Sequence, residues 1–447
     1  MQDNLDVIVI GAGVSGLAAA CELAGRGLAV SILEARERIG GRVFTQRDPK
    51  LDFPIELGAE FIHGRPPEIW QPLQKAKIAI TEVDGDSWCV FEHGIKECDF
   101  FSQVEGILEK MDDSRPDESF AEFLNRRFPN GSDEATEAAK RRALSYVTGF
   151  NAADPALVSV HWLVRETRAE EKIDGDRAFR SANGYADLIG LFQRQIQERG
   201  VGVQLGAVVN RVEWKRGQVS IAARGTGGTR DFMASRVLIT VPLAVLQADA
   251  AERGAIQFRP ELPSEKMEAL NKLEMGKVIR IVLRFRERFW EKILPVHRGK
   301  QNLGDMRFLF GEDEWFPTWW TTMPEKKPII TGWAPFRCAE RLSGQSSDFV
   351  VEKSLQTLSR FLGMSLSQLQ DQFQQSYLHD WQSDPFSRGA YSYAKVRADD
   401  AAEVLGAPVD NTLFFAGEAT DSANTGTVHG AIASGQRAAK EILQELD

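Results

Sequence analysis

The chain has 447 residues, which is too many for one compact core and suits two closely joined domains. A hydrophobic content of 43% with ten tryptophans is typical of a globular protein and excludes a disordered one. The net charge of -10 argues against nucleic acid as a partner, because phosphate neutralisation requires a basic surface. No stretch approaches the roughly 20 apolar residues that span a bilayer, and the acidic N-terminus is unlike a secretory signal. We therefore expect a cytoplasmic protein that binds neither nucleic acid nor a membrane.

The cysteines predict neither a zinc site nor a disulfide framework. They are scattered and include no CxxC pair: Cys21, Cys89, Cys98 and Cys338. Four histidines lie outside any motif and receive no role: His93, His161, His297 and His379. We expect no metal.

The start of the chain has the pattern of a strand, a helix and a second strand. Residues 7–10 are a continuous β-branched run, typical of a strand buried on both faces of a parallel sheet. Glycines break this run, residues 15–25 have a helical pattern, and residues 29–33 are again apolar. This order predicts a parallel β-α-β crossover.

Helix-rich and strand-rich stretches alternate further along the chain. Residues 86–200 are polar and helical in pattern, whereas residues 203–240 change to period two, which predicts antiparallel strands. Later apolar runs predict three strands and a terminal helix: residues 237–241, which return to the central sheet, 278–285 and 413–415, and a helix from Gly430.

A glycine-rich turn lies between the first strand and the first helix. In Gly11-x-Gly13-x-x-Gly16, Gly11 permits the tight turn, Gly13 lets a pyrophosphate approach the backbone, and Gly16 lets helix and strand pack closely. The N-terminal amides of the helix then face the anion. Glu34, at the end of the second strand, can accept hydrogen bonds from ribose hydroxyls. The sequence therefore predicts a dinucleotide site.

The continuation after Glu34 favours FAD over NAD. Gly40 and Gly41 followed by Arg42 extend the binding surface along a longer dinucleotide, and Arg42 can pair with the pyrophosphate. NAD enzymes release their cofactor and need no such clamp. We therefore predict an α/β fold with α+β elements, in which a Rossmann-type FAD-binding domain is interleaved with a mixed sheet-plus-helix substrate domain. The expected segments are 1–85, 200–260 and 376–447 for the first domain, and 86–199 and 261–375 for the second.

Five motifs resemble those of the flavin amine oxidases, in the order that this family has them. The family includes monoamine oxidases, polyamine and spermine oxidases, and lysine-specific histone demethylases. The motifs cover Gly11 to Arg42, the ELGAEFIHG run at 56–64, VPLAVL at 241–246, WxxDPxxxGAYSY at 381–393, and the FAGEAT and TVHGA runs at 415–420 and 427–431.

The resemblance implies a set of cofactor contacts. Glu34 would bind the adenosine ribose, Arg42 the diphosphate, and Glu418 the ribityl or phosphate region. Because monoamine oxidases carry their flavin-bonding cysteine at the position of Ala390, we expect noncovalent FAD. The complete expected set is Gly11, Gly13, Ser15, Gly16, Glu34, Arg36, Gly41, Arg42, Gly58, Ala59, Glu60, Phe61, Val209, Trp381, Glu418, Thr427 and Val428.

The resemblance also implies where an amine would lie. Tyr391 falls at an aromatic wall beside the substrate nitrogen, and Thr427 stands where monoamine oxidases have a second tyrosine, which gives a half-open cage. His63 falls where polyamine and spermine oxidases carry an acid or a histidine near the amine. A neutral imidazole there could accept a hydrogen bond from the substrate nitrogen or set its protonation near physiological pH.

A polyamine also requires negative charge at a distance from the flavin. Glu170 and Glu171 are one candidate pair, by comparison with the acids of the demethylases. The acidic run Glu312-Asp313-Glu314, beside several tryptophans, is a second candidate.

One position departs from the family. A lysine there holds a water against the flavin and assists reoxidation by O2, but alignment on Met275-Gly276 puts Arg280 at this position. Lys277 is an odd number of residues away on a strand, so it would point to the opposite face. Arginine stays charged and cannot relay a proton as lysine can. We therefore expect reduced oxygen reactivity and an enzyme that can pass electrons to another acceptor.

The function that follows is FAD-dependent oxidation of an amine, with a polyamine favoured, and release of H2O2 when O2 is the acceptor. The alternatives are an amine dehydrogenase with another acceptor, an L-amino acid oxidase, and a noncatalytic flavoprotein that binds a partner. Histone demethylation is disfavoured because that family inserts a long coiled coil and adds an N-terminal domain. Glu60, where amino acid oxidases have an arginine for the carboxylate, disfavours an amino acid. A carotenoid desaturase is also disfavoured, because it would need an apolar membrane-facing surface that the composition does not suggest.

Overall fold

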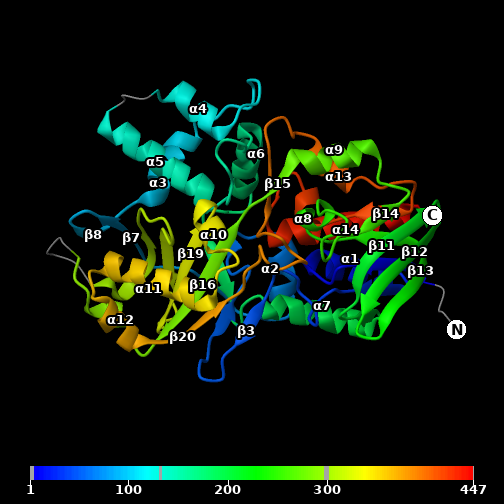
Figure 1. Cartoon of the computed structure of the whole chain (residues 1–447), viewed down its shortest axis with the longest axis horizontal. Helices are drawn as coiled ribbons and strands as arrows, with labels where there is room; N and C mark the ends of the chain where they lie inside the picture. The colour runs from blue at the N-terminus through cyan, green and yellow to red at the C-terminus, as the bar shows by residue number, and fades with distance from the viewer. Residues whose placement is uncertain (1–4, 130–132, 296–301, 446–447) are drawn as a thin grey trace.

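A computed structural model describes residues 5–129, 133–295 and 302–445 (Figure 1). Its first sheet has eight strands in the order β10-β2-β1-β13-β12-β11-β14, with β22 also paired to β13. Their bounds are β10 Gly202–Gln204, β2 Val30–Leu33, β1 Leu5–Ile10, β13 Gly228–Ile239, β12 Gln218–Gly225, β11 Val208–Lys215, β14 Gln257–Arg259 and β22 Leu413–Phe415. His297 lies outside the described residues.

Strand β13 joins the parallel and antiparallel parts of this sheet. Its final residues pair parallel with β1 and with β22, and its earlier residues pair antiparallel with β12. The predicted return of the chain to the central sheet at 237–241 is thus confirmed, and so are the antiparallel strands that precede it.

Two helices from the ends of the chain pack against each other on this sheet. Helix α1 (Val14–Gly25) contacts α14 (Val428–Gln444), and a side chain at Gly435 would lie 2.2 Å from the Ser15 carbonyl oxygen, so the two backbones meet closely. Helix α7 (Ala186–Glu198) also packs on α1, and its buried face belongs to the same core. We therefore propose that the first domain includes α7, although the expected boundary put residues up to 199 in the second domain.

The second large sheet has seven strands in the order β20-β16-β19-β18-β17-β7-β8. Their bounds are β20 Phe373–Leu378, β16 Val278–Phe285, β19 Ile329–Pro335, β18 Thr318–Thr321, β17 Met306–Phe310, β7 Asp86–Phe91 and β8 Gly94–Glu97. Strand β16 is buried at every residue and has the predicted bounds. Figure 1 shows this sheet beside α10 (Arg337–Leu342), α11 (Ser347–Leu362) and α12 (Leu366–Gln372). The core between them includes the fully buried Trp290 and Trp319.

A group of helices from the predicted helical stretch lies on the other side of this sheet, in cyan and green in Figure 1. They are α3 Phe100–Leu108, α4 Phe120–Arg127, α5 Glu134–Gly149 and α6 Val160–Glu171. The remaining elements are α2 Pro67–Lys75, α8 Leu243–Leu246, α9 Ser264–Lys272, α13 Ala401–Gly406, β3 Thr45–Arg47, β4 Pro54–Glu56, β5 Ile62–His63, β6 Ile80–Glu82, β9 Ala178–Ser181, β15 Leu273–Met275 and β21 Ser392–Ala394.

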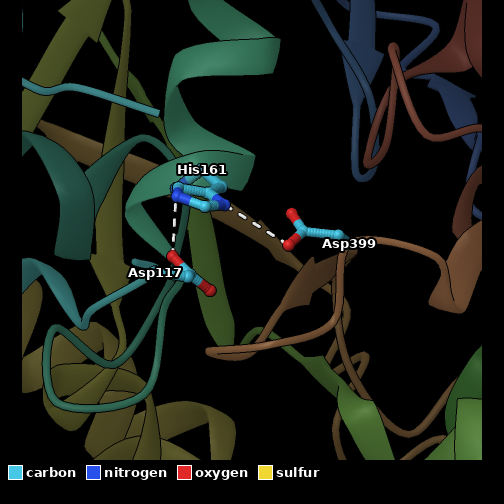
Figure 2. A group of neighbouring side chains, drawn as sticks. All are labelled: Asp117, His161 and Asp399. Carbon is cyan, nitrogen blue, oxygen red and sulfur yellow. Dashed lines mark hydrogen bonds and ion pairs between the residues drawn. The ribbon is translucent and has the colours of Figure 1, made fainter. Parts of the chain in front are cut away.

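Figure 2 shows Asp117 and Asp399 on either side of His161, at the start of α6. The spacing of their ligand atoms could suit a cation, but these atoms already have protein partners. The His161 ring bonds Asp399 and the Arg115 carbonyl oxygen, and Asp117 accepts from two backbone N–H groups and the Ser159 hydroxyl. We interpret the group as a connection between α6 and the loop before α13.

The cysteine prediction was wrong in one respect. Cys89 in β7 and Cys98 just after β8 form a disulfide, because the hairpin brings them to diagonal positions with their Cα atoms 5.7 Å apart. A disulfide is typical of oxidising compartments, which counts against the expected cytoplasmic location. Among the described residues, no helix combines the length and the apolar character needed to cross a bilayer.

Candidate active site

One cavity of about 1330 Å³ brings together the motifs from distant parts of the chain. It is lined by the glycine-rich turn, by the 56–63 segment and by residues 417–431. Helices α3, α5 and α6 and strands β16 to β18 form the rest of its wall. The expected cofactor and substrate residues line this cavity, except Gly16, which packs behind it, and the acidic run at 312–314.

The three glycines of the turn have different surroundings. Gly11 has a φ of +105°, which favours glycine, and a side chain at Gly16 would lie 2.1 Å from the Gly11 carbonyl oxygen. A Cβ atom at Gly13 would meet no atom within 4 Å, on the cavity side of the N-terminus of α1. Space and free N–H groups at a helix N-terminus fit a pyrophosphate.

Glu34 is held at the end of β2 by backbone donors. Its carboxylate accepts from Ala12 N at 2.7 Å and from Arg36 N at 2.9 Å. Arg36 in turn donates to Asp384 at 2.8 Å and to the Ser387 hydroxyl at 2.9 Å. Glu34 therefore lies beside the turn with a fixed orientation, as ribose binding requires.

Arg42 and Glu418 form an ion pair in the wall of the cavity. Arg42 Nη1 lies 2.8 Å from Glu418 Oε1 and also donates to the Ala390 carbonyl oxygen at 2.8 Å. The other carboxylate oxygen of Glu418 accepts from the Ser392 hydroxyl at 2.6 Å and from Gly426 N at 3.0 Å. This pair joins the 42, 390 and 418 segments around the expected cofactor.

Two further cofactor positions are fixed by packing and by capping. A side chain at Gly58 would lie 1.8 Å from the Arg42 carbonyl oxygen, and Trp381 Nε1 donates to the Leu57 carbonyl oxygen at 2.7 Å. Thr427 caps α14, because its hydroxyl oxygen accepts from Gly430 N at 3.0 Å. The N-terminus of α14 therefore faces the cavity with its positive end, which favours negative charge there.

The expected aromatic wall contains residues that the sequence did not indicate. The Tyr391 hydroxyl donates to the Phe150 carbonyl oxygen at 2.5 Å, at the end of α5. The Phe150 ring stacks on Tyr146 with a centroid distance of 5.1 Å and meets the His63 ring edge-to-face at 5.2 Å. Thr427 has no ring, and Phe150 and Tyr146 instead supply aromatic surface beside Tyr391.

His63 lies inside this aromatic group, and its burial lowers the pKa of the imidazole to about 4. The ring is therefore neutral at physiological pH and can accept a hydrogen bond. This pKa favours a role for His63 as a hydrogen-bond acceptor over the alternative, in which it sets the protonation of the amine near physiological pH.

We predict that His63 contributes no ionisation to catalysis between pH 5.5 and 8, because a group with a pKa of about 4 is already deprotonated there. His63→Leu, which removes the hydrogen-bond acceptor, should lower kcat/KM by about tenfold, as for one lost hydrogen bond. The shape of the kcat/KM profile against pH should not change. A limb near pH 6.5 that disappears in the variant would contradict this prediction.

Two carboxyl groups on one face of α6 line the cavity. Glu170 was expected, and Glu166, one turn earlier, was not. Burial, Glu170 and Glu418 raise the pKa of Glu166 well above its ordinary value, and burial and Asp176 raise the pKa of Glu170 to about 7. Burial therefore favours the protonated form of both carboxyl groups more than in an exposed glutamate.

The amide of Asn151 fixes Glu166. Asn151 Nδ2 donates to Glu166 Oε2 at 3.0 Å, and Asn151 Oδ1 is buried with no hydrogen-bond partner among the described residues. Asn151 also lines the cavity.

The other two acidic candidates differ from Glu166 and Glu170. Glu171 also lines the cavity but is exposed. The 312–314 run does not line the cavity, so the structure gives this candidate no support. Glu312 is an exposed partner of Arg141, and Asp313 caps local backbone and pairs with Arg360.

Arg280 extends from β16 into the cavity wall and is buried. It forms an ion pair with Glu60 and donates to the Gly58 carbonyl oxygen at 2.9 Å. Lys277, by contrast, pairs with Glu340 near the surface, 2.9 Å away. Lys277 therefore does not replace the missing lysine, as the strand geometry predicted.

Comparisons with known proteins identify the class. A family model described as flavin containing amine oxidoreductase matches residues 14–95 and 103–443, and the chain belongs to this family. Polyamine oxidase 2 of Arabidopsis thaliana is 29% identical over 471 residues, covering 98% of this chain and 88% of that protein. Lysine-specific histone demethylase 2 of Homo sapiens is 27% identical over 474 residues, covering 98% of this chain but 53% of the demethylase.

Solved structures share the fold across the whole chain. Putrescine oxidase bound to putrescine aligns with a TM-score of 0.79 at 21% identity, and the match covers 99% of both chains. Cyclohexylamine oxidase from Brevibacterium oxydans IH-35A aligns with a TM-score of 0.78 at 19% identity, again over 99% of both chains. The chain is a flavin-dependent amine oxidoreductase, and its cofactor is FAD.

Proposed function

We propose that the protein oxidises a polyamine or a short diamine and binds FAD noncovalently. The observation that carries this proposal is the pair Glu166 and Glu170, which lies in the same cavity as Tyr391 and the cofactor turn. A diamine has one nitrogen to be oxidised and a second that stays protonated. Carboxyl groups in the same cavity as an aromatic wall suit the second nitrogen, because a buried cation requires a charged partner.

Within this proposal the side chains orient and desolvate the amine. Bound FAD accepts the electrons from the amine carbon and nitrogen. Tyr391, Phe150 and Tyr146 exclude water from the carbon to be oxidised. Neutral His63 accepts a hydrogen bond from the reacting nitrogen, and Glu166 with Asn151 holds the distant ammonium. Ala390 offers no sulfur for a covalent bond to the cofactor.

The charges also bear on the alternative substrates. Glu60 is neutralised by Arg180 and Arg280, so its charge by itself no longer disfavours an amino acid. Glu166 and Glu170 do disfavour a carboxylate, because they would lie beside it. For a demethylase, the longest described helix is α14 with 17 residues, which is short for an inserted coiled coil. The polyamine oxidase is also matched over more of its length than the demethylase.

An anaerobic screen tests the proposal without depending on the electron acceptor. Putrescine, spermidine and spermine should bleach the visible absorbance of the bound FAD faster than aromatic monoamines or amino acids. Reduction only by amino acids or neutral compounds would contradict the amine assignment. A yellow protein that no compound reduces would favour the noncatalytic alternative.

Arg280 supports a second candidate, an amine dehydrogenase with an acceptor other than O2. We predict that Arg280→Lys speeds reoxidation of the reduced protein by O2 by at least about tenfold, because lysine can hold a water and relay a proton. Stopped-flow mixing of reduced protein with O2 measures this rate. An unchanged rate would refute a role for Arg280 in limiting oxygen reactivity, and H2O2 would then be the expected product.

A further inference from the structure

A buried carboxylate, Glu60, joins two arginines at the edge of the cavity. Arg180 Nε and Nη2 lie 2.8 Å and 2.7 Å from Glu60 Oε1, and Arg280 Nη2 pairs with Oε2. Trp320 Nε1 also donates to Oε2 at 2.9 Å. Burial alone would raise the pKa of Glu60, but the two arginines hold it below its usual value. The three ionised side chains carry a net charge of +1.

The two arginines differ in what else they contact. Arg180 donates to the carbonyl oxygens of Met323 at 2.7 Å and Thr321 at 3.2 Å, and it does not line the cavity. Arg280 lines the cavity, and its Nε is buried without a hydrogen-bond partner among the described residues. Of the two arginines in this cluster, Arg280 is therefore the one whose positive charge lies at the cavity wall.

Glu60 helps to fix the position of the Arg280 guanidinium. A guanidinium is a planar fork, so fixing one Nη on a carboxylate and the other on the Gly58 carbonyl oxygen also fixes the direction of Nε–H. The Trp320 ring, with its centroid 5.4 Å from Arg280 Cζ, packs along the same group. Without Glu60, the long side chain would keep only one of these charged or polar anchors.

We propose that Glu60 is a positioning residue that fixes the Arg280 guanidinium against the bound FAD, so that a permanent positive charge raises the midpoint potential of the cofactor. Reduction adds negative charge to the flavin, and a fixed cation in a dry site stabilises that charge more than a mobile, solvated one does. The proposal rests on FAD occupying this cavity. It does not depend on which amine is oxidised.

The test is the midpoint potential of bound FAD, measured anaerobically against a reference dye. Arg280→Met should shift the potential downward, because it removes the charge. Glu60→Gln should also shift it downward, although it removes a negative charge, because the guanidinium is released. In the double variant the potential should lie at or above that of Arg280→Met, because without Arg280 only the loss of the carboxylate charge remains. Arg180→Lys is the matched control, since it keeps its charge outside the cavity, and its potential should equal that of the unchanged protein.

An upward shift in Glu60→Gln would overturn the proposal, because the carboxylate would then act only as an opposing charge. An unchanged potential in Arg280→Met would overturn it as well. If Glu60→Gln does not retain FAD, Glu60→Asp keeps the net charge and withdraws the carboxylate by one methylene. A lower potential in Glu60→Asp supports positioning, and an unchanged one contradicts it. If no amine reduces the flavin in the anaerobic screen, the midpoint potentials can still be measured and interpreted.

Discussion

Gly13→Leu is expected to give a folded protein that no longer binds FAD. The backbone at Gly13 has φ -70° and ψ 174°, which any residue can adopt, and a Cβ atom there would meet no protein atom within 4 Å. The side chain would instead occupy the space at the helix N-terminus that a pyrophosphate requires. We expect FAD affinity to fall at least about 1,000-fold, since several phosphate hydrogen bonds would be lost together.

Absorbance at the flavin band and circular dichroism measure the two parts of this prediction. Gly13→Leu should purify colourless with an unchanged far-ultraviolet spectrum, and its stability should fall by only about 1 kcal/mol as a helix cap changes. Gly16→Ala is the informative contrast, because its Cβ would lie 2.1 Å from the Gly11 carbonyl oxygen. That variant should lose solubility or folded structure itself. A yellow Gly13→Leu protein would show that the cofactor phosphates bind elsewhere.

Glu166→Gln should lower kcat/KM for putrescine or spermidine by about 10- to 100-fold, the value of one charged hydrogen bond at 1.5–3 kcal/mol. The glutamine keeps the shape and the contact with Asn151 but cannot ionise beside a bound ammonium. A monoamine of similar length lacks that ammonium, so its kcat/KM should change less than about threefold. Glu171→Gln removes the same charge from an exposed neighbour and should affect neither substrate.

The raised pKa values of Glu166 and Glu170 should make diamine binding depend on pH. A bound cation favours the ionised carboxyl, so binding must release protons wherever Glu166 or Glu170 is protonated in the empty site. Diamine affinity should therefore improve as pH rises through about 7, the pKa of Glu170, and Glu170→Gln should weaken this dependence. Calorimetry in buffers of different ionisation enthalpy counts the released protons. Equal losses for the diamine and the monoamine in Glu166→Gln would contradict the assignment of Glu166 to the second nitrogen.

The sequence predicted the secondary-structure elements that depend mainly on residues close to one another in the chain. The β-branched run of β1, the turn glycines and the buried strand β16 each follow from neighbouring residues, and the structure has them with nearly the predicted bounds. Cys89 and Cys98 could also have been paired, because Gly94 lies between two alternating segments that form a hairpin. Counting cysteines without that hairpin led to the wrong conclusion.

The missed residues depend on contacts between distant segments. Phe150 and Asn151 follow the end of α5 and carry no motif, so only the packing of that end against Tyr391 brings them to the cavity. Glu166 did carry a signal, since it lies four residues before Glu170 and shares its helix face. The joining of Glu60 to both Arg180 and Arg280 required three segments to meet, which no local pattern predicts.

The order of the central sheet has a consequence for how the holoenzyme is made. Strand β22 completes the sheet on β13, and α14 covers α1 while its N-terminus lines the cavity, yet both come from the last part of the described chain. A nascent chain that still lacks them exposes the apolar surface of α1 and has only part of the FAD cavity. Loading of FAD must therefore follow synthesis of α14, and scarcity of flavin would leave a nearly folded apoprotein rather than a stalled early intermediate.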